Sequence, residues 1–328
     1  MKKFVILFLC FGFLAANATS WRVNNNPAID ADFSDLTTAI AAAAEGDTLY
    51  IEGTQFNYGD ILLNKHLVLI GPGYFLDQND STQVNYNPAE LALLEIDTVA
   101  SGSHIYGLSF TGKVRMGGSD VVFSRNHLLY YSIELAWGNH IIGCVISQNF
   151  LKSIDQSSYD AYNILITNNY VDNQIDLNND CTCTILNNVS GYKIDVFNSV
   201  IKNNITYGGN NGGIHVNENN VIEYNIMNYQ SGAFPPGPGN IEGIEPADVF
   251  VDFGGNLGYS EDGQWQLKEG SIAIGYGEGG VDCGMFGGSS PYVLSGLPAV
   301  PHIYEAIVPT SGSAASGLPV TIKVKSQN

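Results

Sequence analysis

The chain has little positive charge and little charge of any kind. Its 328 residues include 13 Lys and Arg against 32 Asp and Glu, which gives a formal charge of −19, and charged residues make up only 14% of the sequence. Nucleic acids and anionic membranes select basic surfaces, so this composition argues against both as partners. A hydrophobic fraction of 45% excludes a disordered polyanion and indicates a packed core.

Cysteines are few, and long apolar runs are missing. Beyond residue 18 only Cys144, Cys181, Cys183 and Cys283 remain, and their spacing matches neither a disulfide framework nor a zinc pattern. We therefore expect them to be small buried side chains. No run is long enough to cross a bilayer, so no transmembrane segment is predicted. A nucleophile elbow, a phosphate-binding glycine loop and a helical zinc motif are also missing.

The first residues are typical of a signal peptide. Lys2 and Lys3 precede a short apolar run, residues 4–14, and residues 16–18 (Ala-Asn-Ala) supply small side chains for cleavage. We predict that residues 1–18 are removed and that the mature protein is exported, either secreted or held at the cell surface. Their removal takes away two lysines and no acid, so the formal charge changes from −19 to −21.

One amphipathic helix precedes a series of β-type segments. The apolar residues of 36–43 fall on one helical face, and Asp32 or Ser34 can cap its start. Strand-like runs follow at residues 47–51 and 62–70. From there on, short β-type runs alternate with Asn, Gly and Ser, and no second amphipathic helix is predicted.

An apolar residue followed three positions later by Asn recurs with a period near 20 residues. The pairs are Phe123 with Asn126, Ile146 with Asn149, Ile166 with Asn169, Ile185 with Asn188, Ile201 with Asn204, and Ile222 with Asn225. A unit of this length cannot bury an apolar face alone, but stacked copies form a continuous core. Asn suits a corner because it tolerates left-handed backbone, and stacked Asn side chains form an amide ladder. The repeat therefore predicts a solenoid.

Triplets with a polar centre recur with the same period, and their flanking residues are apolar except for Gln156. Their central residues are Glu95, Arg115, Glu134, Asp155, Asp176, Asp195 and His215. Alternate strand residues face opposite sides, so the flanking residues fill the core and the central ones face outward. Parallel strands stack about 4.8 Å apart, which predicts that these seven side chains form one column on an outer face. We call this set the charged column.

These repeats, with two further motifs, resemble the pectate-lyase-like family of secreted bacterial proteins. Residues 36–51 resemble its entry, a capping helix that leads into the first turn, and residues 265–277 and 282–288 resemble its closing turns. The resemblance implies an all-β fold: a right-handed parallel β-helix solenoid over residues 19–290 with a short N-terminal capping helix. Residues 291–328 are expected to form a small Pro/Ser/Gly-rich tail with one or two strands, packed on the last turn or presented for sorting.

The charged column is the candidate functional site. Like charges on neighbouring strands are destabilising, so a bound cation or a catalytic role would explain the carboxylates. Asp155, Asp176 and Asp195 are candidate calcium ligands or a catalytic carboxyl pair. The resemblance to lyases implies Lys193 as a base. The candidate substrate contacts are Arg115, Glu134 and His215.

Three functions remain open at this stage, because the family includes polysaccharide lyases, glycoside hydrolases, adhesins and members with no known activity. The first is recognition of a polysaccharide on the acidic sheet face, without turnover. The second is an enzyme, a polysaccharide lyase or glycoside hydrolase that uses the stacked carboxylates. The third is a structural or adhesive solenoid whose acidic face serves only solubility. Fold analogy alone does not decide among them.

Overall fold

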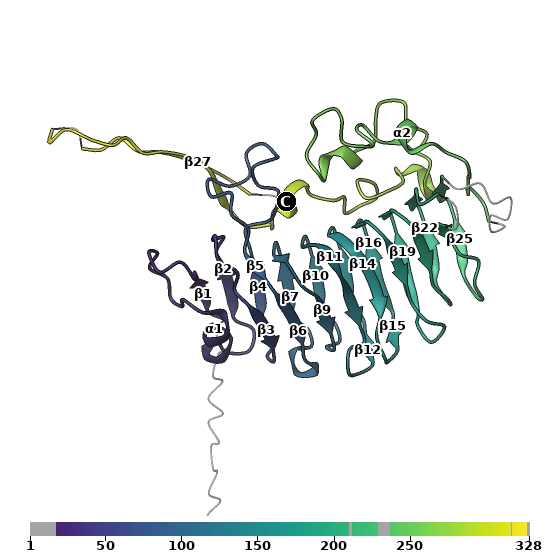
Figure 1. Ribbon diagram of the computed structural model, residues 1–328, viewed down its shortest axis with the longest axis horizontal. Helices are drawn as coiled ribbons and strands as arrows, with labels where there is room; N and C mark the ends of the chain where they lie inside the picture. The colour runs from purple at the N-terminus through teal and green to yellow at the C-terminus, as the bar shows by residue number, and fades with distance from the viewer. Residues whose placement is uncertain (1–17, 210–211, 229–236, 316, 327–328) are drawn as a thin grey trace, which may run out of the picture.

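The computed structural model describes residues 18–209, 212–228, 237–315 and 317–326. The predicted signal peptide, apart from Ala18, lies outside the described residues. The chain winds into an all-β parallel solenoid whose strands stack coil upon coil (Figure 1). The predicted fold class is confirmed at the level of a parallel β-solenoid with few helices.

One face of the solenoid is a ten-stranded parallel sheet, which we call sheet A. Its strands, in spatial order, are β1 (Ser20–Val23), β2 (Thr48–Ile51), β4 (Val68–Ile70), β7 (His104–Tyr106), β10 (Val122–Ser124), β13 (Val145–Ser147), β16 (Ile164–Thr167), β19 (Cys183–Leu186), β22 (Val200–Lys202) and β25 (Val221–Glu223). Successive coils are in register, which aligns the inward side chains in one buried row from Leu49 to Ile222.

The second sheet, sheet B, bends so that most coils contribute two strand segments. The segments in line with the charged column are β3 (Asp60–Leu63), β6 (Leu93–Ile96), β9 (Val114–Met116), the ends of β11 (His127–Leu135) and β14 (Phe150–Gln156), β18 (Gln174–Asp176), β21 (Lys193–Asp195) and β24 (Gly213–Ile214). The other segments, most of which follow an Asn corner, are β5 (Glu90–Leu91), β8 (Ser109–Phe110), the starts of β11 and β14, β17 (Tyr170–Val171), β20 (Val189–Ser190), β23 (Ile205–Thr206) and β26 (Ile226–Met227). A small sheet pairs β12 (Ile141–Ile142) with β15 (Ala161–Tyr162).

The predicted Asn ladder is confirmed and is one coil longer than expected. Each buried Asn donates through Nδ2 to Oδ1 of the next, at 2.9 to 3.3 Å, from Asn126 through Asn225 to Asn240. The left-handed residue is not the ladder Asn itself. The residue directly before each ladder Asn from Asn126 to Asn225 is left-handed instead, with φ between 53° and 59°. These residues are Arg125, Gln148, Asn168, Asn187, Asn203 and Tyr224. The ladder Asn therefore points inward while its predecessor turns the corner.

Two local expectations at the N-terminal end need correction. The helix α1 (Leu36–Ala42) is capped by Asp35, which accepts from Thr38 N at 2.7 Å, and not by Asp32 or Ser34. The run 62–70 is two strands, β3 and β4, on different sheets. In the turn between them, Lys65 Nζ donates to the carbonyl oxygens of Ile40 (2.9 Å) and Ala43 (2.6 Å) at the end of α1, which fixes the turn against the helix.

The last coils do not extend to residue 290. From the one-turn helix α2 (Pro246–Val249), a mostly irregular segment runs back over the outside of sheet B and forms a layer (Figure 1). We call residues 246–297 the return layer. Five left-handed corner residues hydrogen-bond its backbone in reverse chain order: Asn203 with Glu278, Asn187 with Asp282, Asn168 with Met285 and Gly287, Gln148 with Pro291, and Arg125 with Leu297. The motifs at 265–288 therefore cover the solenoid and are not its closing turns.

A second hydrophobic core forms beneath this layer. Outward residues of sheet B, among them Phe150 and Tyr170, pack against Phe250, Trp265 and other return-layer side chains. Trp265 stacks between two tyrosines, with ring centroids 4.6 Å from Tyr170 and 4.9 Å from Tyr207. The return layer thus buries one face of sheet B and leaves the charged column uncovered.

The tail ends in an antiparallel hairpin of β27 (His302–Ile307) and β28 (Thr321–Lys325), so the expected strands are present. It does not pack on the last turn. The hairpin lies beside the first coils, where Val84 N donates to Ile303 O at 3.0 Å, and projects away from the body (Figure 1). Its apolar side chains remain exposed, as Val324 is at 55%.

The four cysteines beyond residue 18 are buried and free, as expected. Across the described residues, no helix has the length and apolar character needed to cross a membrane.

His127 makes the protein's stability depend on pH. Its Nε2 is buried without a hydrogen-bond partner among the described residues, its Nδ1 lies 3.2 Å from Ser109 Oγ, and its ring packs against Tyr74 and Phe75. Burial lowers the pKa of His127 from 6.5 to about 4. Between these values the unfolded chain binds a proton that the folded chain does not. Stability is therefore complete above about pH 6.5 and falls as the pH drops, by roughly 2 kcal/mol at pH 5.

Urea unfolding at pH 7 and pH 5 measures this loss, with His127→Phe as the comparison. The wild type should lose more stability than the variant at pH 5, since the variant has no proton to bind. Equal losses in the two proteins would show that other groups cause the acid sensitivity.

Candidate functional site

Strand pairing places the charged column in register. Glu95, Arg115, Glu134, Asp155, Asp176 and Asp195 are paired in that order on consecutive strands. His215 completes the column, because its N–H donates to Ile194 O at 2.9 Å. The flanking apolar residues are buried, with one exception. Val216 is 58% exposed because β24 ends at Ile214, so the last triplet reaches the core only through Ile214.

The first half of the column is a chain of ion pairs. Arg115 lies between two acids, with NH1 3.5 Å from Glu95 Oε2 and Nε 3.3 Å from Glu134 Oε2. Lys113, on the same face two residues earlier, contacts the other carboxylate oxygen of Glu134. The guanidinium of Arg115 also stacks on Trp137, with Cζ 4.0 Å from the ring centroid. This end therefore presents a fixed cation on an aromatic plane.

The second half is centred on Lys193. Its Nζ lies 2.7 Å from Asp176 Oδ2 and 3.0 Å from Asp195 Oδ2. Asp195 has two further partners, since Asn217 Nδ2 donates to Oδ1 at 2.7 Å and His215 Nδ1 lies 3.0 Å from Oδ2. Lys193 thus holds the carboxylates of two consecutive coils together.

Asp155, between the two halves, accepts from Gln174 Nε2 at 3.0 Å. The like charges of the column are compensated by neighbouring side chains of the protein itself. The compensating groups lie two strand positions away on the same outer face: Lys113, Gln174 and Lys193 before the column residue, and Asn217 after it. This spacing is visible in the sequence. The compensating residues can therefore be recognised in the sequence, but which carboxylate each one contacts is seen only in the structure.

Protonation in the second half suits neither Lys193 as a general base nor Asp195 as a general acid. Burial alone would lower the pKa of Lys193, but its hydrogen bonds to Asp176 and Asp195 outweigh this effect and raise that pKa. For Asp195, burial favours protonation, yet the hydrogen bonds from Asn217 and Lys193 prevail and lower its pKa. A general base must be deprotonated and a general acid protonated at the working pH. In this geometry Lys193 is held as a cation and Asp195 as an anion.

A calcium ion does not fit the column as it stands. Calcium takes six to eight oxygen ligands, and several carboxylates must converge on it. Asp155, Asp176 and Asp195 sit on three consecutive coils, and Lys193 occupies the space between the last two. Among the residues that the structure describes, no three His, Cys, Asp or Glu side chains are arranged to hold a metal ion.

Aromatic side chains line the surroundings of the column. In β11 a shift in register between Leu128 and Ser132 lets the chain bulge, and this bulge carries Tyr130 and Tyr131. Tyr130 is 76% exposed, and Tyr131 is 46% exposed. Exposed aromatic planes beside ordered polar groups can stack on sugar rings and orient hydroxyls.

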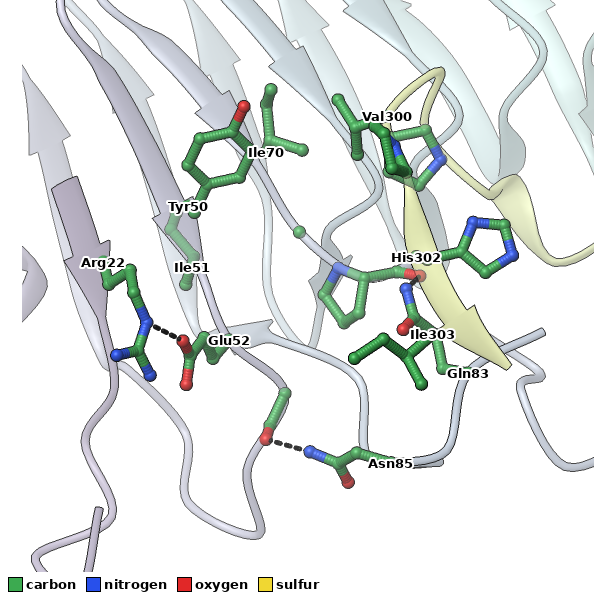
Figure 2. Close-up of a pocket in the computed structure, with 15 residues that line it drawn as sticks. Arg22, Tyr50, Ile51, Glu52, Ile70, Gln83, Asn85, Val300, His302 and Ile303 are labelled. Atoms are coloured by element: carbon green, nitrogen blue, oxygen red, sulfur yellow. Dashed lines mark hydrogen bonds and ion pairs between the residues drawn. The ribbon is translucent and has the colours of Figure 1, made fainter. Parts of the chain in front are cut away.

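A groove on the outer face of sheet A is a second candidate surface. Figure 2 shows Tyr50 and Ile70 from sheet A on one side and Val300 and Ile303 on the other, around a cavity of about 540 Å³. The ion pair between Arg22 Nε and Glu52 Oε1, at 2.6 Å, closes one end (Figure 2).

An adjoining hollow of about 320 Å³ shares Ile70 and Val300 with this groove and extends it past Tyr106 to Arg125 and Gln148. Tyr50, Ile70 and Tyr106 are paired on consecutive strands, so the two tyrosines lie on one line along the coils. This groove could not be predicted from the sequence, because one of its walls comes from the tail, more than 200 residues after Tyr50 and Ile70.

The chain matches no protein-family model, and it matches no curated protein. Among solved structures it is similar to the crystal structure of pectate lyase Pel9A, with 14% sequence identity over 82% of this chain and 96% of that chain and a TM-score of 0.33. A likeness of this size carries no argument about residues or activity. The solenoid is established by the strand pairing itself.

Proposed function

We propose that the protein is an exported β-solenoid that binds a polysaccharide on the charged column without turning it over. The observation that carries this proposal is the clamp of Lys193 between Asp176 and Asp195. It leaves the candidate base protonated and the neighbouring acid ionised. A face of paired, fixed polar groups supports binding better than proton transfer.

The column offers regularly repeated contacts to an extended ligand. Side chains recur about every 4.8 Å, and Arg115, Glu134 and His215 supply donors and acceptors along one line. Trp137 and the exposed tyrosines of the β11 bulge add apolar planes beside it. The formal charge of −21 after leader removal repels polyanions, so we propose a neutral glycan as the ligand.

The two alternatives make different demands on the same residues. A lyase or hydrolase needs Lys193 or one carboxyl group in the opposite protonation state, so substrate binding would first have to break the clamp. A purely structural solenoid needs no ligand at all, and nothing in its function would depend on Trp137 or Tyr130.

Retention on immobilised neutral and uronic polysaccharides tests the proposal. We expect the wild type to be retained on a neutral glycan, and Trp137→Ala to weaken binding about tenfold, because stacking on an aromatic plane contributes roughly 1.4 kcal/mol. Tyr86→Ala removes an exposed aromatic residue away from the column and should change nothing.

Tyr50→Ala distinguishes the two surfaces in the same assay. Loss of binding in this variant, with Trp137→Ala unaffected, would move the site to the groove of Figure 2. Absence of retention on every polysaccharide would overturn the proposal and favour the structural solenoid.

A further inference from the structure

Asp47 is a buried carboxylate at the start of the first coil. It is 2% exposed and accepts three hydrogen bonds, from Thr19 N at 2.7 Å, Trp21 Nε1 at 2.9 Å and Ala44 N at 2.9 Å. The hydrogen bond from Thr19 is the largest of the causes that lower the pKa of Asp47, so the group is ionised. Lys65 does not pair with it, because its ammonium donates to carbonyl oxygens of α1.

Buried carboxylates are usually paired with a cation. None of the ion pairs among the described residues includes Asp47. Its hydrogen-bond partners are neutral N–H donors, and the charge of Lys65 also lowers the pKa of Asp47 although no ion pair joins the two. The first of these donors, Thr19 N, belongs to the residue that directly follows the predicted cleavage point.

Both backbone polar groups of Thr19 are hydrogen-bonded to the first coil. Its carbonyl oxygen accepts from Thr48 N at 2.9 Å, its nitrogen faces Asp47, and β1 begins at the next residue. Ala18 is exposed. The bond between Ala18 and Thr19 thus lies where exposed chain enters the fold.

We propose that removal of the leader after Ala18 converts Thr19 N into an α-ammonium that forms an ion pair with buried Asp47 and completes the first coil. An export peptidase hydrolyses the bond with one water molecule. The water oxygen bonds to the Ala18 carbonyl carbon, and the leader is released with a C-terminal carboxylate. The C–N bond breaks, and the Thr19 nitrogen leaves as an amine.

That amine takes up a proton at neutral pH, because an α-amino group has an ordinary pKa of about 7.7–8.0. In the precursor only the acceptor of this hydrogen bond is charged, whereas in the mature chain the donor is charged as well, which adds the attraction between two opposite charges at close range. The mature chain therefore holds its first coil more firmly than the precursor, in which the same nitrogen is a neutral amide.

Two chains that differ by one residue test this. One begins at Thr19 and the other at Ala18, so that the second keeps the N–H donor and moves the charge away. We expect the chain that begins at Thr19 to melt higher by about 2–4 °C. Asp47→Asn should remove the difference. Asp32→Asn is the matched control, since exposed Asp32 binds the nearby Arg22 N at 2.8 Å, and it should leave the difference intact.

A second measurement covers the case in which Asp47→Asn does not fold. An α-ammonium held by Asp47 should react with an acylating reagent at pH 7 at least fivefold more slowly in the folded wild type than in urea. The exported protein should also begin at Thr19 by mass spectrometry. Equal melting temperatures of the two chains, equal reactivity, or a different first residue would each overturn the inference. None of these readouts involves glycan binding, so the two proposals fail separately.

Discussion

Asn169→Ala should lower the free energy of unfolding by about 3–5 kcal/mol. Asn169 is fully buried, donates to Ile146 O at 2.8 Å and to Asn188 Oδ1 at 3.0 Å, and accepts from Asn149 N and Nδ2. Alanine removes the amide donor and the amide acceptor of Asn169 together, so its buried partners on both neighbouring coils lose hydrogen bonds, and each polar group left unsatisfied costs about 1–3 kcal/mol. Denaturant unfolding followed by circular dichroism measures the loss.

Asn179→Ala is the control for this experiment. Asn179 is an exposed turn residue, outside the ladder, and its replacement should change stability by less than about 0.5 kcal/mol. Similar losses in the two variants would show that the ladder does not contribute specially to stability. An Asn169→Ala protein with wild-type stability would contradict the structural account of the corner.

Trp265→Ala should detach the return layer. This side chain stacks on Tyr170 and Tyr207 and meets Phe250 edge-on at 5.1 Å, so its loss leaves a large cavity in the second core. Truncation of a buried Trp costs about 3–5 kcal/mol. The solenoid has its own separate core, so we expect the layer to open while the coils stay folded.

Limited proteolysis with mass spectrometry locates this opening. New cleavage sites should appear between residues 246 and 297, and the β-sheet circular dichroism signal should persist. Trp137→Ala, which removes a partly exposed Trp on the column, should give the wild-type digestion pattern. Global unfolding of Trp265→Ala would show that the layer and the coils form one cooperative unit.

The sequence predicts those features that repeat. The Asn ladder and the charged column recur about every 20 residues, and a parallel solenoid converts that spacing directly into neighbours in space. Helix α1 was predictable because its apolar residues follow the helical period, although its cap was misplaced by a few residues.

Features without a period could not be predicted in this way. The return layer is mostly irregular, and its contacts join residues such as Asn168 and Met285, which are 117 positions apart. The corner side chains that hold it appear in the sequence only as the residues before the ladder Asn. Their outward direction follows from the left-handed backbone, which only the structure shows.

The chemistry of the column was predictable only in part. Register brought Asp176 and Asp195 together as expected, but side-chain rotamers decide whether Lys193 points to them or to solvent. In the structure the Lys193 side chain points to both carboxylates and forms an ion pair with each. The sequence therefore located the candidate site and left its protonation state open.

Product analysis during glycan binding tests the central claim most directly. A polysaccharide that retains the wild-type protein is incubated with it, and new reducing ends and new unsaturated ends are measured over time. We predict stable retention with neither kind of end. Unsaturated ends that disappear in Lys193→Ala would show lyase chemistry on the column, and new reducing ends alone would show hydrolysis; either result would contradict the account.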